Sequence, residues 1–352
     1  MISFRSWNNE PMRGDPQVSV LLPVHNAEPF LDACLDSLCK QTLDDFEIVA
    51  VDDGSTDASP LILASRARSD SRVRVIRQPH MGLVAALNRG LSHCTGDFVA
   101  RMDADDLAHP ERMRMQADAL CADPAIDVLS CRVSIFASQG VGRGFELYEA
   151  WLNSLVRNDD IQRDLYVESP LPHPSVMMKR DLLRDAGGYR DLGWPEDYDL
   201  WLRLAARGCR FEKLENVLLH WRDHGQRLTR TDPRYAVERF LACKAHHLAT
   251  GPLRGRQRVL VWGAGQTGRR LSKHLLRHRL PLEAFVDIDV AKSGRTLRRR
   301  PIVLPDQLET LRRDGSPPVL LAAVASRGAR KRIRRHLETR GWRETQDFWC
   351  VA

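Results

Sequence analysis

Three carboxylates fall within four consecutive positions of the stretch FVARMDADDLAHPER, which runs from Phe98 to Arg112. They belong to Asp103, Asp105 and Asp106. Carboxylates this close repel one another unless a positive group lies between them. Mg²⁺ and Mn²⁺ prefer carboxylate oxygens and often share their shell with substrate phosphates, so the stretch predicts a divalent-cation site. Short acidic pairs also arise by chance, and the surrounding elements must therefore support this interpretation.

The segments around this acidic cluster alternate between strand and helix patterns. Short apolar runs predict buried strands at residues 18–24, 46–53, 73–78 and 96–103. Helices are predicted between them, at residues 27–41, 59–69 and 82–94. This alternation indicates an α/β fold, with a parallel sheet and helices on both of its faces.

Polar residues follow the predicted strands at the edge where such a sheet binds ligands, beyond the carboxyl ends of its strands. They are Pro23, Val24, His25 and Asn26 at the end of the first strand, Asp52 and Asp53 at the end of the second, and the acidic cluster at the end of the fourth. A purely structural role would not explain why carboxylates gather where they repel one another. A bound divalent cation would explain it.

The ordered set of segments resembles the bacterial family 2 glycosyltransferases, which have the GT-A fold. The resemblance covers about residues 17–225. Its segments are VSVLLPVHNAEPFLDACLDSLCKQT, FEIVAVDDGSTD, GLVAALNRGL, ARMDADDLAHPERMRMQ, HPSVMMKR, GGYRD and PEDYDLWLRLAARG. The resemblance implies an inverting, metal-dependent hexosyl- or N-acetylhexosaminyl-transferase. The donor would be a nucleotide-diphosphate sugar, by family habit a UDP-sugar. The acceptor would be a hydroxyl of a cell-surface glycan, a lipid-linked glycan or a protein.

The resemblance also implies a set of donor-binding residues. These are Pro23, Val24, His25, Asn26, Asp52, Asp53, Asn88, Arg101 and Asp103. Asp53 would bond the base, and Asp52 would either assist it or cap the following turn. For Asn88 and Arg101, a structural role is an equal alternative.

A Mn²⁺ or Mg²⁺ ion would then lie at the acidic cluster. The resemblance implies Asp105 as its direct ligand and Asp103 as a neighbour of the ribose or of the ion's waters. Asp106 could equally cap the turn that follows. A later His ligand is typical of the family, and the WRDH pattern favours His224.

The acceptor hydroxyl needs a general base, which must lie within hydrogen-bond reach of it. The acidic pair of WPEDYDLW matches Asp197 as this base and Glu196 as a residue that orients it. Alternatively, these acids only stabilise a helix N-terminus. His173 and Trp194 are candidate acceptor contacts, and each has a buried structural role as its alternative.

A second glycine-rich motif lies near the C-terminus. VLVWGAGQTG places GxGxxG at Gly263, Gly265 and Gly268 between a strand and a helix, and FVDID follows with Asp287. This is the context of a dinucleotide-binding fingerprint, so the alternative function is a nucleotide-binding sensor or an NAD-dependent enzyme centred on this motif. The segment also resembles small Rossmann-like domains beside bacterial sugar-modifying enzymes, which need not bind NAD. NAD is therefore not expected.

Length and charge predict three segments: a flexible tail at residues 1–16, a GT-A glycosyltransferase domain at 17–250 and a smaller, basic Rossmann-like α/β domain at 257–352. Residues 251–352 hold 23 Lys and Arg against 9 Asp and Glu, a net charge of +14, whereas residues 1–250 have a net charge of −7. A basic domain fits peripheral contact with an anionic membrane; a merely solvated basic surface is the alternative.

The remaining features concern the compartment. The eight cysteines include no CxxC pair, no apolar run approaches the ~20 residues that span a bilayer, and the N-terminal residues lack a signal-peptide pattern. We expect a cytoplasmic protein, peripheral on the inner face of the membrane if it binds lipid, with no nucleic-acid partner. The sequence does not indicate an oligomeric state.

Overall fold

The computed structural model describes residues 15–138, 140–313 and 316–352. All but two residues of the predicted tail, 1–16, therefore lie outside the described residues. The chain packs as two compact units. Unit 1 comprises Met1–Asn153, Leu171–Tyr189 and Lys213–Asp223, and unit 2 comprises Ser154–Pro170, Arg190–Glu212 and His224–Ala352. The predicted domain boundaries at residues 17, 250 and 257 stay predictions.

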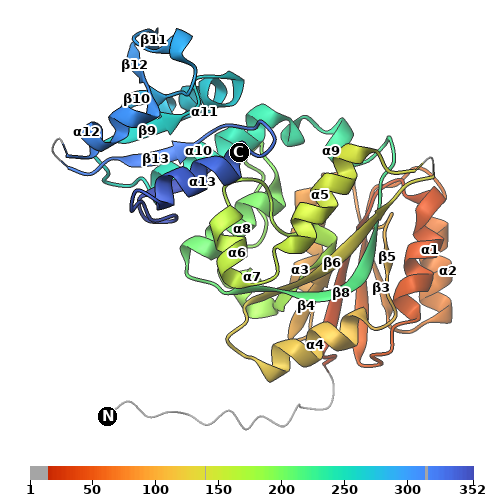
Figure 1. Ribbon diagram of the computed structural model, residues 1–352. Coiled ribbons are helices and arrows are strands. Elements are labelled where there is room, and N and C mark those ends of the chain that lie inside the picture. The colour runs from red at the N-terminus through yellow and green to blue at the C-terminus, as the bar shows by residue number, and fades with distance from the viewer. Residues whose placement is uncertain (1–14, 139, 314–315) are drawn as a thin grey trace. The chain divides into compact units, whose positions relative to one another are not determined.

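Unit 1 is built on an eight-stranded sheet with the order β3-β2-β1-β4-β7-β6-β8-β5 (Figure 1). Its strands are β1 (Val18–Val24), β2 (Phe46–Asp53), β3 (Val73–Gln78), β4 (Phe98–Arg101), β5 (Leu107–Ala108), β6 (Val128–Phe136), β7 (Met177–Lys179) and β8 (Phe211–Arg222). The first four strands are parallel, as predicted. However, β7 runs antiparallel to β4 and to β6, and β5 runs antiparallel to β8. The sheet is therefore mixed, and the prediction of a parallel sheet holds only for its first half.

The helices of this unit are α1 (Glu28–Cys39), α2 (Ser59–Ser69), α3 (Leu83–His93), α4 (Arg112–Ala122), α5 (Arg143–Ser154), α7 (Arg180–Asp185) and the 3₁₀ turn η1 (His173–Ser175). In α1, Leu31, Leu35 and Leu38 recur at helical spacing and are fully buried. In α3, Gly90 lies against β1, because a Cβ there would come within 2.3 Å of the Leu21 side chain.

Unit 2 contains a six-stranded sheet with the order β11-β12-β10-β9-β13-β14. The strands are β9 (Val259–Trp262), β10 (Leu282–Val286), β11 (Thr296–Leu297), β12 (Arg300–Val303), β13 (Val319–Ala322) and β14 (Phe348–Cys350). The helices are α6 (Asn158–Asp164), α8 (Glu196–Ala206), α9 (Leu228–Thr231), α10 (Val237–Thr250), α11 (Gln266–Arg277), α12 (Leu308–Arg313) and α13 (Ala329–Glu338), and the 3₁₀ turns are η2 (Pro233–Tyr235), η3 (Val290–Lys292) and η4 (Pro305–Gln307). The pairs β12–β10, β10–β9, β9–β13 and β13–β14 are parallel, and β11 is antiparallel to β12.

Within residues 15–138, 140–313 and 316–352, no helix has both the length and the apolar composition needed to cross a membrane. The eight cysteines are free thiols.

Candidate active site

Asp53 ends β2 and anchors the loop that follows β3. Its buried carboxylate accepts hydrogen bonds from Gln78 Nε2 at 2.6 Å, from the Met81 amide at 2.9 Å and from the Gly82 amide at 2.8 Å. Burial by itself raises the pKa of Asp53, but these hydrogen bonds and the nearby His80 outweigh it and hold the pKa below its ordinary value. Asp53 is therefore an ionised group in a fixed position.

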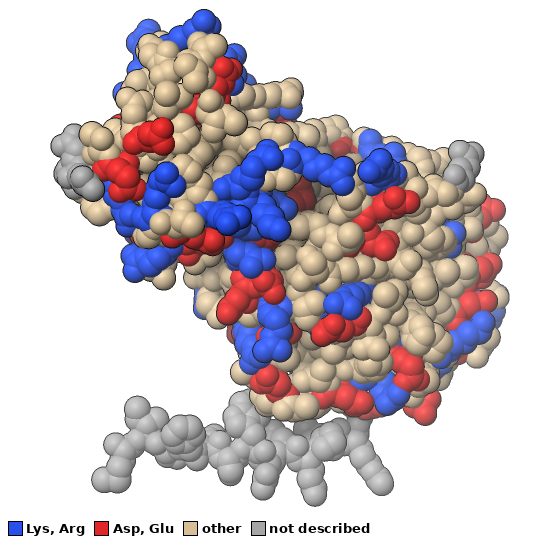
Figure 2. Space-filling view, viewed as in Figure 1, with Lys and Arg blue, Asp and Glu red and all other residues tan. Residues whose placement is uncertain are grey.

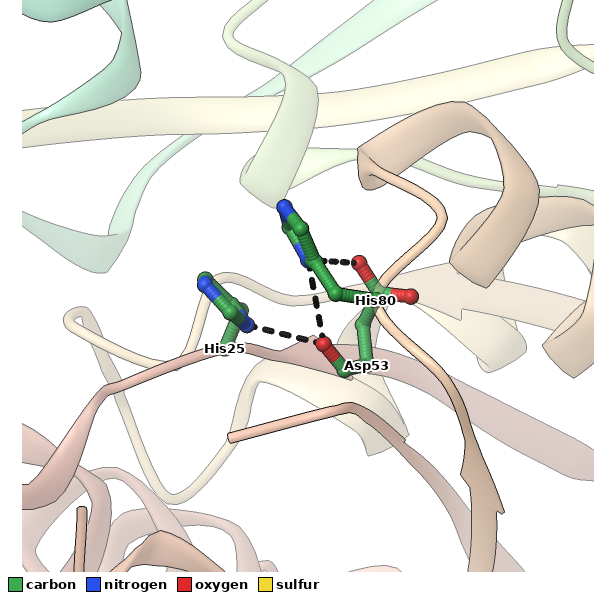
Figure 3. Close-up of side chains that lie close together, drawn as sticks. All are labelled: His25, Asp53 and His80. Carbon is green, nitrogen blue, oxygen red and sulfur yellow. Dashed lines mark hydrogen bonds and ion pairs between the residues drawn. The ribbon is translucent and has the colours of Figure 1, made fainter. Parts of the chain in front are cut away.

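Two histidines lie together over Asp53 (Figure 3). His25 Nδ1 lies 2.8 Å from the Asp53 carbonyl oxygen, and His80 Nδ1 lies 2.9 Å from its carboxylate. The two rings stack, with centroids 4.0 Å apart and planes inclined by 21°. Both side chains are exposed, so this pair presents a flat polar surface at the end of the sheet. Sequence reasoning identified His25 but missed His80, whose signal was its place just before Gly82 and the predicted helix.

Gly54 makes the approach of the His80 loop to β2 possible. Its φ of +68° suits glycine, and a Cβ would lie 2.5 Å from the His80 backbone nitrogen. Any other residue would have to shift this loop, and with it the groups that hold Asp53.

Three other predicted donor residues hold the backbone in place. Asp52 Oδ1 accepts the Ser55 amide at 3.0 Å, which is the turn-capping role considered from sequence. Asn26 Oδ1 accepts the Thr56 amide at 2.8 Å and so joins the loops after β1 and β2. Asn88 bonds both backbone groups of Tyr189, donating to the carbonyl at 2.9 Å and accepting from the amide at 3.0 Å. A contact between these residues and the nucleotide-sugar donor stays a prediction. The same holds for the buried Pro23 and Val24.

The acidic cluster follows β4 and is interleaved with arginines. The buried Arg101 guanidinium pairs with the Asp103 carboxylate. Arg222 Nε donates to the Asp105 carbonyl at 2.7 Å, and the Arg222 amide donates to Asp106 Oδ1 at 2.7 Å. Positive groups therefore already lie beside two members of the cluster, which reduces the repulsion that the sequence raised.

The cluster has the donor atoms that a hard cation needs. Asp103, Asp105 and Asp106 each offer a carboxylate oxygen within 4.8 Å of those of the other two. Asp103 and Asp105 are partly exposed, whereas Asp106 is buried and tied to β8 through Arg222. Asp103 and Asp105 could thus bind a small divalent ion. Asp106 would instead hold the loop against β8 through the Arg222 amide.

Unit 2 holds the acidic pair at the start of α8. Both carboxylate oxygens of the buried Glu196 accept the Tyr235 hydroxyl, at 3.0 and 2.9 Å. Asp197 is partly exposed, and its Oδ1 accepts the Tyr198 amide at 2.7 Å. Asp197 thus lies in the first turn of α8, where the sequence placed its alternative role of stabilising the helix N-terminus, and its role as a base stays a prediction. Tyr235 was not identified from sequence, because nothing in its local pattern points to Glu196.

Asp199, in the first turn of the same helix, is a buried structural hub. Its carboxylate contacts Trp194 Nε1 at 3.2 Å, His247 Nε2 at 2.9 Å and Arg203 Nε at 2.7 Å. Burial opposes its ionisation, but the hydrogen bonds from His247 and Arg203 outweigh it and lower the pKa to about 2. Trp194 is thus anchored by its ring nitrogen, and its ring lies against His246, with centroids 5.4 Å apart.

The remaining predicted residues are distributed between the units. His173 lies in η1 and is buried, with Nε2 at 3.2 Å from the Tyr189 hydroxyl. His224 belongs to unit 2, whereas the acidic cluster belongs to unit 1, and its role as a metal ligand stays a prediction. Gly263, Gly265 and Asp287 line a cavity in unit 2, and Gly268 packs against the turn that begins at Gly263.

The chain is similar to proteins of one known family. The family model of Glycosyl transferase family 2 matches residues 19–187, a range that includes Asp53 and the acidic cluster and ends before Glu196 and Asp197. The amylovoran biosynthesis glycosyltransferase AmsE of Erwinia amylovora is 35% identical over 204 residues, which are 57% of this chain and 74% of that protein.

Two further comparisons concern a sequence relative and a solved structure. The UDP-Gal:alpha-D-GlcNAc-diphosphoundecaprenol beta-1,3-galactosyltransferase of Escherichia coli is 30% identical over 59% of this chain and 74% of its own length. The crystal structure of S. aureus TarS 1-349 in complex with UDP-GlcNAc superposes with a TM-score of 0.56 at 20% identity, over 74% of this chain and 72% of that one. The chain therefore belongs to glycosyl transferase family 2, has the GT-A fold, and is a glycosyltransferase that acts on nucleotide sugars.

Proposed function

We propose that the chain moves a hexose or N-acetylhexosamine from a UDP-sugar to a hydroxyl of a lipid-linked or polysaccharide glycan, with inversion at the anomeric carbon. The name of the E. coli relative supports this, since that protein uses UDP-Gal and a diphosphoundecaprenol-linked GlcNAc. The E. amylovora relative acts in amylovoran biosynthesis. A protein acceptor is the alternative that the acceptor assay below would detect.

The observation that carries the proposal is the adjacency of three strand ends in unit 1. β1 pairs in parallel with β2, where Val24 lies opposite Asp52, and with β4, where Leu21 lies opposite Arg101. The loops after these strands therefore leave the same edge of the sheet. One carries the ionised Asp53 and the next the acidic cluster, which is the order needed to hold a nucleoside and then its diphosphate.

Asp103 and Asp105 would hold the divalent cation, Mn²⁺ or Mg²⁺, with His224 as the expected later ligand. When bound there, the cation supplies positive charge that stabilises the negative charge growing on the departing diphosphate. Asp53 and the stacked His25 and His80 would hold the base at the end of β2.

The acceptor would be activated by Asp197. Its carboxylate would take the proton of the acceptor hydroxyl while that oxygen attacks the anomeric carbon, opposite the bond to the diphosphate. The bond to the nucleoside diphosphate breaks as the new glycosidic bond forms, which inverts the anomeric configuration. Glu196, held by Tyr235, would fix the first turn of α8 and thus the direction of Asp197.

We further propose that basic residues of unit 2 bring the enzyme to the anionic inner face of the membrane, where a lipid-linked acceptor lies. On the face drawn in Figure 2, Lys and Arg gather over the segment that carries α13. Lys331 and Arg335 of this helix are exposed, whereas Ile333 and Leu337 are buried in the unit. The contact would therefore be electrostatic, worth about 1 kcal/mol per basic residue near the surface, without insertion. Vesicles containing anionic lipid should retain the protein at low salt, and failure to retain it would contradict this contact.

The test of the main proposal is a donor and acceptor assay on the purified chain. Panels of UDP-, GDP- and dTDP-sugars are offered with Mn²⁺, alone and with a synthetic GlcNAc-diphospho-lipid or a peptide acceptor. We expect one UDP-sugar to be consumed, EDTA to stop the reaction, and NMR to show an inverted anomeric configuration. Transfer that continues in EDTA, or a product with retained configuration, would refute the proposal.

A further inference from the structure

A cavity of about 600 Å³ lies in unit 2, at the carboxyl ends of its parallel strands. This volume falls in the range of small-molecule sites, roughly 300–1,000 Å³. Its lining comes from the loops after β9, β10 and β13, from Pro305 and from one face of α13. None of the residues assigned to sugar transfer belongs to it.

The strand order places this cavity where ligands bind in doubly wound sheets. The parallel strands run β12-β10-β9-β13-β14, which is the spatial order 3-2-1-4-5 when they are numbered along the chain. The order reverses between β9 and β13, and the crevice at such a reversal is the usual binding site of the fold. Gly263 after β9 and Ala323 after β13 both line the cavity.

The glycines after β9 have different reasons for lacking a side chain. Gly263 has φ of +121°, and a Cβ would lie 2.7 Å from the Ala323 carbonyl. At Gly268, a Cβ would lie 1.8 Å from the Gly263 carbonyl, so this glycine lets α11 approach the turn. Gly265 has an ordinary φ of −83°, and a Cβ there would meet nothing within 4 Å. Because Gly265 has no side chain, the cavity stays open at the start of α11, and a ligand can approach the backbone there.

The surroundings of Gly265 suit phosphate. The first hydrogen bond of α11 runs from the Arg269 amide to the Gly265 carbonyl, so the amides of residues 266–268 precede the internal ladder of the helix. Such amides and the helix dipole attract anions. Arg332 adds positive charge to the lining of the same cavity, and Lys292, also in the lining, is paired with Asp287 and Asp289.

The end of β10 suits a ribose and a base. The Asp287 carboxylate is fixed by the Ala264 amide at 2.9 Å, the Asp289 amide at 3.0 Å and Lys292 Nζ at 3.1 Å. An acidic residue in this position of the fold bonds ribose hydroxyls. The next residue, Ile288, lines the cavity and is 74% exposed, so it offers an apolar surface to a nucleobase.

We propose that this cavity binds the nucleoside diphosphate part of a second ligand, with its phosphates at the Gly265 turn and its ribose at Asp287. Two sources share this chemistry: the ADP half of a dinucleotide such as NAD⁺, and a nucleotide sugar. The site is separate from the donor site in unit 1, and it needs no divalent cation because its positive groups belong to the protein.

Calorimetric titration of the full chain in EDTA with ADP, NAD⁺, UDP and UDP-GlcNAc tests this site. We expect one molecule of at least one nucleotide to bind without metal, and Gly265→Val to weaken that binding by about tenfold or more, because its side chain fills the approach to the backbone. Arg332→Ala should weaken it several-fold, whereas the matched control Arg335→Ala, an exposed residue of the same helix outside the cavity, should change it by less than about twofold. The melting temperature of each variant checks that it folds.

Asp105→Ala separates this site from the donor site. It should remove metal-dependent donor binding and leave the binding in EDTA unchanged, even if the chain proves to transfer no sugar. The proposal is overturned if the wild type binds none of the four nucleotides in EDTA, if Gly265→Val binds as the wild type does, or if Asp105→Ala abolishes the binding. Tighter binding of NAD⁺ than of ADP identifies a dinucleotide, and tighter binding of UDP-GlcNAc than of UDP identifies a nucleotide sugar; either supports the site.

Discussion

Asp199→Asn tests whether the negative charge of the buried Asp199 stabilises the fold around the hub formed with Trp194, His247 and Arg203. In the folded protein the Asp199 carboxyl has a pKa of about 2, compared with an ordinary value of 3.8. One pKa unit corresponds to about 1.4 kcal/mol, so the ionised carboxylate contributes about 2 kcal/mol to the free energy of unfolding at neutral pH. Asn keeps the shape of the side chain but not its charge, and we expect the variant to lose that amount.

The dependence on pH follows from the direction of the shift. Because the folded pKa lies below the unfolded one, the contribution is complete well above pH 4 and is lost as the pH falls through about 2. The difference between wild type and Asp199→Asn should thus shrink from about 2 kcal/mol at pH 7 to about 1 kcal/mol at pH 3.

Urea unfolding followed by tryptophan fluorescence measures this difference, since Trp194 donates to the same carboxylate. The matched control is Asp181→Asn, which removes a carboxylate that is 79% exposed and lies 3.5 Å from Arg180. Exposed ion pairs contribute roughly 0–1 kcal/mol, so this variant should remain close to the wild type. If Asp199→Asn loses no more stability than this control, or if its loss is the same at pH 3 and pH 7, the charge-based account of the hub is wrong.

Three further predictions concern the proposed transfer site. Mn²⁺-dependent donor binding, measured by titration calorimetry, should be abolished in Asp105→Ala, weakened in Asp103→Ala and least affected in Asp106→Ala. The last variant should nevertheless lower the unfolding free energy, measured in urea, by about 1–3 kcal/mol, because it removes the buried carboxylate that accepts the Arg222 amide. Asp197→Asn should reduce the rate of sugar transfer by about 100-fold or more while donor binding persists, and transfer at the wild-type rate would exclude this residue as the base. Gly54→Ala should lower the melting temperature and weaken donor binding, since its φ is positive and a Cβ would lie 2.5 Å from the next loop.

Two controls make these outcomes specific. Gly144→Ala replaces a glycine whose Cβ would meet nothing within 4 Å, so it should leave stability and binding near those of the wild type. Asp118→Asn removes an exposed carboxylate from α4 and should leave Mn²⁺-dependent binding unchanged. If Asp103→Ala weakens binding more than Asp105→Ala does, the acidic motif has been aligned with the metal-binding motif of the family one residue out of register.

The parallel half of the sheet could be predicted because its strands are short runs rich in apolar residues that end at polar ones. Val18–Val24 and Phe46–Asp53 are buried throughout, and the predicted bounds agree with β1 and β2. The antiparallel half could not be predicted in the same way. β5 is only two residues long, and β8 has exposed residues at its centre that leave only the short apolar run before His220, so neither gives a long apolar run. Their pairing depends on contacts between distant segments, such as Leu107 with His220.

Helix boundaries show the same limit. α4 begins only at Arg112, since the residues before it form a turn in which the Arg112 amide is bonded to the His109 carbonyl. Residues 233–250 divide into η2 and α10, because Asp232 caps the short turn through the Arg234 amide. Local apolar spacing marks the middle of a helix, whereas side-chain and turn contacts decide where it begins.

The candidate site shows why residue types were easier to predict than their partners. Asp53 and the acidic cluster stand at strand ends, where a local pattern identifies them. The partners of these carboxylates come from other segments of the chain: His80 contacts Asp53, Tyr235 contacts Glu196, and the Arg222 amide contacts Asp106. The spacing of residues in the sequence does not predict these contacts. The fold supplies these partners, and they determine which carboxylates are held in place and which face a ligand.

The partners also give a physical reason for the expected order among the three acids. Asp106 is buried and its Oδ1 is bonded by the Arg222 amide, so a cation would gain least from it. Asp103 pairs with Arg101, and a cation must share that carboxylate with the guanidinium. At Asp105, Arg222 bonds the backbone carbonyl, and the side chain is partly exposed. Arg101→Lys would test this account, because it keeps the charge but loses the fork geometry. We expect tighter Mn²⁺ binding in the variant, and unchanged or weaker binding, with the fold intact, would show that Arg101 supports the cation site instead of competing with it.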